Sequence, residues 1–72
     1  MYQIASTRIP TLTVFVSNFK GVIYYQGQFV GKTFLDLNGF GFETIFGHEI
    51  VRQSGYSSTI AAAEGLWTNF IQ

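Results

Sequence analysis

Residues 28–46, QFVGKTFLDLNGFGFETIF, decide the fold, because they alternate short β-branched and aromatic runs with glycine. This pattern is typical of extended strands joined by tight turns. Asn38-Gly39 divides the stretch, since both residues accept the positive φ that a two-residue type I′ hairpin requires. The stretch therefore predicts an antiparallel hairpin formed by residues 28–37 and 40–46, with a bulge or bend at Gly31.

Two more strands are predicted on the N-terminal side of this hairpin. Residues 11–19 (TLTVFVSNF) and 22–25 (VIYY) are likewise rich in β-branched and aromatic residues. Lys20-Gly21 and Gln26-Gly27 are the predicted turns. Residues 1–10, which end at a proline, are expected to form a loosely held N-terminal arm or a short edge strand. Residues 48–52 (HEIVR) are expected to continue the fourth strand beyond a bend at Gly47.

A helix is predicted from residue 59 to residue 71, after Ser58, whose hydroxyl can accept from the unpaired amides of the first turn. Its apolar residues recur at helical spacing and form a stripe that is expected to pack on the sheet. The stripe consists of Ile60, Ala63, Leu66, Trp67, Phe70 and Ile71. The opposite arc is small and almost uncharged, and it consists of Ser58, Ala61, Ala62, Gly65 and Asn69.

Gly65 is the least expected residue of this helix, because glycine costs up to about 1 kcal/mol relative to alanine in a helix interior. One interpretation is that another backbone approaches closely over Ala61 and Gly65. The other is that the alanines are present as good helix formers and that the glycine is a tolerated weakness.

A chain of 72 residues is long enough for one domain, so residues 1–72 are predicted to form a single domain. The order of the predicted strands and helix indicates the α+β class. The domain is expected to be a meander of about four antiparallel strands backed by one C-terminal helix. The chain has no cysteine, no signal-peptide pattern, and no run of the roughly 18 apolar residues that a membrane helix needs. We therefore expect a cytoplasmic protein without disulfides or a membrane segment.

Charge is scarce, since 11% of the residues are charged, against about 25% in typical soluble domains. Hydrophobic residues make up 47%, aromatic residues 18%, and the net charge is zero. The surface must then be partly apolar, and no field of one sign exists to attract nucleic acid or anionic lipid.

Both faces of the predicted sheet carry apolar side chains. Leu12, Val14 and Val16 share one face of the first strand, whereas Phe15 and Phe19 point the other way. One helix covers one face, so a second copy or another protein is expected to cover the rest. Two alternatives are a register slip and a sheet that curls until both faces are buried.

The predicted interface lies either on the sheet face or on the small back of the helix. The sheet-face candidates are Phe15, Phe19, Tyr25 and Phe34, and the helix candidates are Ala61 and Gly65.

Catalytic, cofactor and metal sites are not predicted. His48 is the only histidine and no cysteine accompanies it, whereas a catalytic metal usually takes three protein ligands. The spaced glycines of residues 39–47 lack the lysine and Ser/Thr of a phosphate loop.

We therefore expect a small non-enzymatic protein-interaction module of accessory or inhibitor type, of microbial or phage origin, that acts as a homo-oligomer. The alternative is a weak nucleic-acid-binding module that stacks bases on the aromatic sheet face, assisted by Lys20, Lys32 and Arg52.

Overall fold

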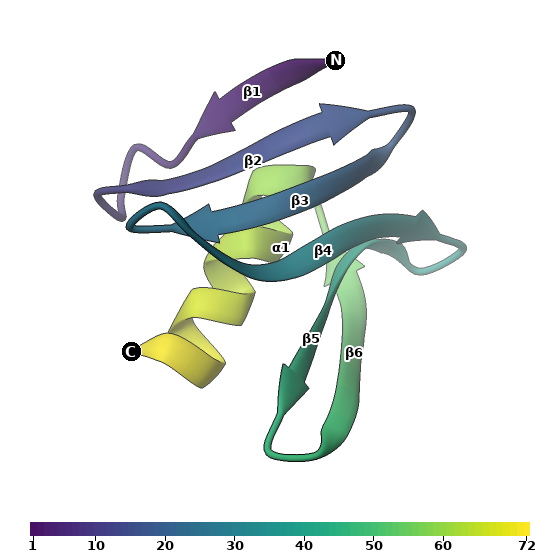
Figure 1. The fold of residues 1–72 in the computed structure, drawn as a ribbon. Helices are drawn as coiled ribbons and strands as arrows, with labels where there is room; N and C mark the ends of the chain where they lie inside the picture. Colours follow the sequence, from purple (N-terminus) through teal and green to yellow (C-terminus); the bar gives the residue numbers. More distant parts are fainter.

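The computed structural model describes residues 1–72 and shows one antiparallel sheet of six strands with a C-terminal helix behind it (Figure 1). The predicted α+β class is confirmed, but the sheet has six strands instead of about four. Each strand pairs with its neighbours in the chain, so the sheet is an uninterrupted meander. The strands are β1 (Tyr2–Ala5), β2 (Leu12–Ser17), β3 (Lys20–Tyr25), β4 (Gln28–Asp36), β5 (Gly39–Phe46) and β6 (Glu49–Tyr56).

The two additional strands lie at the edges of the sheet. β1 pairs antiparallel with β2, so the N-terminal segment is an edge strand. β6 does not continue β5, as predicted for residues 48–52, but folds back and pairs with it. The chain reverses at Gly47-His48, where Gly47 has a φ of 67°. A positive φ at the first turn position suits a type II′ hairpin, which glycine there favours.

Two predicted turns are displaced along the chain. Ser17 pairs with Lys20, so the β2–β3 turn lies at Asn18-Phe19, both at positive φ, and not at Lys20-Gly21. The β4–β5 turn is also one residue earlier than predicted, because Asp36 pairs with Gly39.

The β4–β5 turn is formed by Leu37 and Asn38. The main-chain N–H of Asn38 donates to Oδ1 of Asp36 at 2.8 Å, which stabilises this turn locally. Leu37 consequently projects into solvent.

The core lies between the inner face of the sheet and the helix. Leu12, Val14 and Val16 are buried there, as their alternation predicts. Phe42 of β5 is the largest fully buried side chain, and it contacts the rings of Tyr56 and Phe70. The core cluster consists of Ile9, Leu12, Val14, Val16, Ile23, Phe42, Ala63 and Leu66.

The helix occupies the predicted residues, but it changes character along its length. α1 (Thr59–Leu66) is α-helical, and η1 (Trp67–Ile71) is a π-helical turn. Oγ of Ser58 accepts from the main-chain N–H of Ala61 at 3.1 Å, which confirms the predicted cap. Nδ2 of Asn69 donates to the carbonyl of Gly65 at 2.9 Å. It thereby takes the carbonyl that the amide of residue 69 would use in an α-helix.

The sheet bends around the helix and does not lie flat against it. α1 packs against β2, β4, β5 and β6, and the β5–β6 hairpin turns away from the first four strands in Figure 1. Ala62 was predicted on the outer arc of the helix but is fully buried, because this bend brings strands to a second side of the helix. No helix of the protein combines the length and the apolarity needed to cross a membrane.

Candidate interaction surface

The outer face of the sheet, opposite the helix, carries a row of aromatic rings in edge contact. The ring centroids of Phe15 and Tyr24 are 5.6 Å apart, and those of Tyr24 and Phe29 are 6.4 Å apart. Phe15, Tyr24 and Phe29 are called the aromatic ladder below. Phe15 is 39% exposed and Phe29 is 56% exposed. The ladder crosses β2, β3 and β4 and lies on the side of the sheet that no element covers.

A β-bulge brings Phe29 into the ladder. Ile23 pairs with Gly31, whereas Tyr24 pairs with Phe29, so Val30 is an extra residue in β4. An extra residue reverses the alternation of side chains beyond it. Phe29 therefore shares the outer face with Phe34, although regular alternation places the two on opposite faces.

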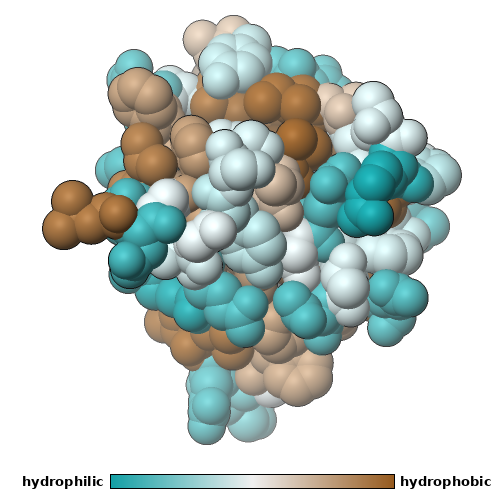
Figure 2. Space-filling view, turned by 180° about the vertical axis from the view of Figure 1, so that it is seen from behind, coloured by the Kyte–Doolittle hydropathy of each residue, from teal (hydrophilic) through white to brown (hydrophobic).

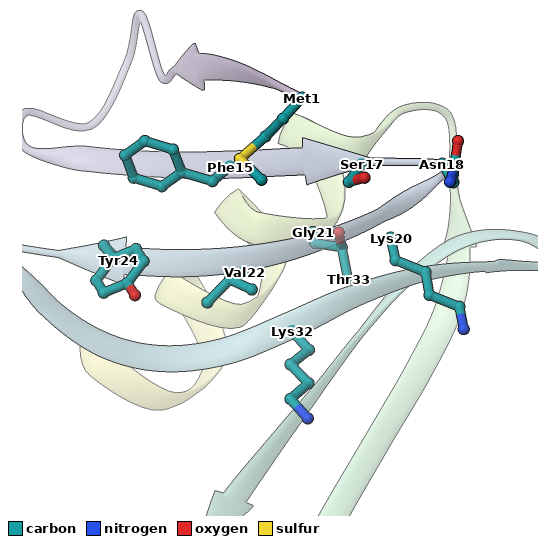
Figure 3. Close-up of a pocket in the computed structure, with 10 residues that line it drawn as sticks. All are labelled: Met1, Phe15, Ser17, Asn18, Lys20, Gly21, Val22, Tyr24, Lys32 and Thr33. Atoms are coloured by element: carbon teal, nitrogen blue, oxygen red, sulfur yellow. The ribbon is translucent and has the colours of Figure 1, made fainter.

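A shallow depression of about 940 Å³ lies beside the ladder (Figure 3). Its apolar lining comes from Met1, Phe15, Val22 and Tyr24, and Lys20 and Lys32 lie at one side. Neither lysine forms an ion pair, and the lining contains no carboxylate. The depression can therefore accept an apolar or planar group that carries a negative charge.

Farther along the outer face, a charged pair covers Phe34. Cζ of Arg52 lies 4.1 Å from the centroid of the Phe34 ring, and its Nε lies 3.3 Å from Oε1 of Glu43. The guanidinium thus stacks on the ring while it pairs with the carboxylate. Phe34 is half-buried as a result.

The four predicted sheet-face residues do not form one patch. Phe15 belongs to the ladder, and Phe19 is 66% exposed in the β2–β3 turn. Tyr25 lies on the inner face, paired with Leu12, and its ring centroid is 6.2 Å from that of Trp67. Because Tyr25 follows Tyr24, alternation turns it toward the helix.

The two predicted helix residues are packed against the protein itself. A Cβ on Gly65 would lie within 2.6 Å of Cε1 of Tyr56, so the tyrosine ring fills the space that a side chain would need. The close approach that Gly65 indicates is therefore real, but it involves a side chain of β6 and not another backbone. Ala61 is half-buried beside it.

Sequence reasoning did not assign several apolar residues to the candidate surfaces. Tyr24 and Phe29 complete the ladder, and the glycine at position 31 was the only signal of the bulge that aligns them. Ile45, Phe46 and Ile50 are exposed near the tip of the β5–β6 hairpin, which was not predicted as a hairpin. On the helix side, Figure 2 shows apolar areas broken up by polar ones.

The surface has few side chains that could act as acids, bases or metal ligands. His48 is exposed at the β5–β6 turn. Nowhere do three His, Cys, Asp or Glu side chains gather as ligands for a metal ion. Comparison with protein-family models, with curated proteins and with solved structures found no match.

Proposed function

We propose that this protein is a non-enzymatic interaction module that self-associates as a twofold dimer through the aromatic ladder. The observation that carries the proposal is the exposure of Phe15 and Phe29 on the sheet face opposite the helix. Exposed clusters of aromatic side chains are typical of the centres of protein interfaces. An accessory or inhibitor role in the cytoplasm of a microbe or in a phage belongs to the same proposal.

The composition favours a second copy as the partner. With a net charge of zero, no long-range repulsion separates the copies. A twofold contact uses one self-complementary patch on both copies and ends growth, whereas an open contact would continue into a filament. Burial of a few hundred Å² of apolar surface at about 25 cal/mol per Å² offsets several kcal/mol of the association cost.

Sedimentation equilibrium across micromolar concentrations tests this proposal. The parent protein should reach the mass of a dimer, and Phe15→Glu should shift the equilibrium to the monomer. Phe19→Glu is the matched control, because Phe19 is more exposed but lies in the β2–β3 turn outside the ladder. A monomeric parent at every concentration would reject self-association, and equal effects of the two variants would reject the ladder as its site.

Binding of single-stranded nucleic acid is a second candidate, favoured by Lys20 and Lys32 beside the ladder rings. Aromatic rings can stack bases, and lysines contact phosphates. Two phosphate contacts give a slope of log K against log salt of about −1.4 for single strands. A titration of a labelled oligothymidylate of about 12 nucleotides should show this slope, reduced by half in Lys32→Gln. No binding at low salt would remove this candidate.

A further inference from the structure

β4 and β5 are paired along only part of their lengths. Their register runs from Lys32–Glu43 to Asp36–Gly39, next to the turn that joins them. Residues 28–31 of β4 continue along β3, and residues 44–46 of β5 continue along β6. The two strands therefore diverge beyond the Lys32–Glu43 pair, as the angle between them in Figure 1 shows. The gap between residues 28–31 and 44–46 is called the fork below.

The apex of the fork is held by specific contacts. Oγ1 of Thr44 donates to the carbonyl of Val30, the bulge residue, at 2.8 Å. A Cβ added to Gly31 would lie 2.6 Å from Cδ1 of Leu66 and 2.7 Å from the carbonyl oxygen of Glu43, so the site has little room for a side chain. The strands therefore approach closely at the apex and separate because the bulge bends β4. Behind the fork, the ring centroids of Phe46 and Phe70 lie 5.3 Å apart.

Main-chain groups of both strands face the fork. Gln28 and Phe46 each flank a two-residue turn and pair there with Tyr25 and Glu49. In an antiparallel hairpin, such flanking residues direct their N–H and C=O groups to each other, and the next residue directs its groups to the opposite side. Phe29 and Ile45, one position farther along, thus turn their main-chain groups into the fork. Neither residue has a partner across the fork, because the pairing of β4 with β5 ends at Lys32–Glu43.

The side chains around the fork are apolar and exposed. A notch of about 400 Å³ is lined by Phe29, Val30, Ile45 and Ile50. Ile45 is 72% exposed and Ile50 is 69% exposed. A notch of this volume accepts a large apolar side chain.

The fork carries one positive charge, that of Lys32, which no carboxylate neutralises. Lys32 and Glu43 both line the notch, but Glu43 pairs with Arg52 at 3.3 Å. Lys32 forms no ion pair, so a cation stands at the edge of an apolar notch. A ligand that complements this charge carries a carboxylate next to its apolar group.

We propose that the fork binds an extended peptide strand of a partner protein, which places an apolar side chain in the notch and an acidic side chain on Lys32. The peptide main chain pairs with the groups of Phe29 and Ile45, as in strand addition to an open sheet edge. The fork lies at one end of the ladder, where Phe29 belongs to both surfaces and Lys32 lines both the notch and the depression beside the ladder. The inference goes beyond the proposed dimer and does not depend on it.

A phage-displayed library of random 12-residue peptides, selected against the immobilised full chain, supplies the probe. We expect enrichment of peptides in which apolar residues alternate and an acidic residue is adjacent. A synthetic peptide of the consensus should bind at least ten times more weakly to Ile50→Lys. Lys32→Gln should bind more weakly by a few-fold and lose the preference for the acidic residue.

Leu37→Lys is the matched control for Ile50→Lys, because it places the same charge on another exposed apolar residue, at the β4–β5 turn and outside the fork. It should bind the peptide as the parent does, and so should Phe15→Glu, which separates the fork from the ladder. Circular dichroism checks that every variant keeps its fold.

Hydrogen exchange distinguishes strand pairing from a purely apolar contact. Bound peptide should slow exchange of the main-chain amides of Phe29 and Ile45, because both would gain a hydrogen-bond partner. The proposal is overturned by a library without enrichment, by a consensus peptide that binds Ile50→Lys as tightly as the parent, or by unchanged exchange at both amides. Self-association of the parent that Ile50→Lys abolishes would also overturn it, because the occupant would then be a second copy.

Discussion

Gly65→Ala should destabilise the protein, although alanine is the better helix former. Relative to glycine, alanine contributes up to about 1 kcal/mol in a helix interior. The added Cβ would lie 2.5 Å from Cζ and 2.6 Å from Cε1 of Tyr56, well inside van der Waals contact. Tyr56 also packs on the fully buried Phe42, with ring centroids 6.1 Å apart, so its ring cannot move freely inward.

The magnitude follows from these two opposing effects. Overpacking of a well-packed site costs about 1–3 kcal/mol. After subtraction of the helix preference, the net loss is about 1 kcal/mol, which corresponds to a decrease in Tm of roughly 4–8 °C for a domain of this size. Thermal and urea unfolding followed by circular dichroism measure it.

A second background makes the prediction specific to the tyrosine ring. In Tyr56→Val the ring atoms near residue 65 are gone, and valine suits an edge strand. In that background Gly65→Ala should increase stability by up to about 1 kcal/mol. The change of sign between the two backgrounds is the expected result. If Gly65→Ala stabilises the parent, or acts with the same sign in both backgrounds, the explanation of this glycine is wrong.

Three further substitutions test other contacts of the fold. Ser58→Ala should cost about 1 kcal/mol of unfolding free energy, because the hydroxyl caps the amide of Ala61. Glu64→Gln should cost about 1 kcal/mol, since the carboxylate accepts from Oγ of Ser6 at 2.7 Å and holds the N-terminal segment on the helix, and faster hydrogen exchange in β1 should accompany it. Phe42→Ala should cost about 3–5 kcal/mol, which is enough to abolish cooperative unfolding in a domain of this size.

Each of these variants has a matched control on the surface. Ser57→Ala, Glu49→Gln and Phe46→Ala change the same residue types where they are exposed. Each control should cost less than its partner. A control that costs as much as its partner would show that the named contact does not carry the stability assigned to it.

The strands and the helix were predictable where local chemistry dominates. β-branched and aromatic runs marked β2 to β5, and the 3.6-residue period with Ser58 as the cap marked the helix. β6 was missed because Glu49, Arg52 and Gln53 interrupt its apolar pattern, as expected for a half-exposed edge strand. The glycine at position 47 was the sequence signal that could have separated β5 from β6, because glycine readily takes the positive φ that the turn has there.

The candidate surfaces were less predictable because they depend on register. The bulge at Val30 places Phe29 beside Tyr24, and one residue of register decides that arrangement. Tyr25 was placed on the wrong face of the sheet because its face follows from the β2–β3 pairing, in which it lies opposite the buried Leu12. The fork depends on where β4 and β5 stop pairing, which no local pattern marks.

The sequential strand order has a consequence for synthesis on the ribosome. Each strand after β1 pairs with the strand made just before it, so the sheet can assemble while the chain is still growing. The helix that covers its inner face is made after all six strands. Until Ala63 and Leu66 emerge, the nascent sheet presents Val14, Ile23 and Phe42 to its surroundings. A truncated product that ends before Thr59 would therefore be prone to aggregation, and it should be bound by chaperones or degraded by proteases.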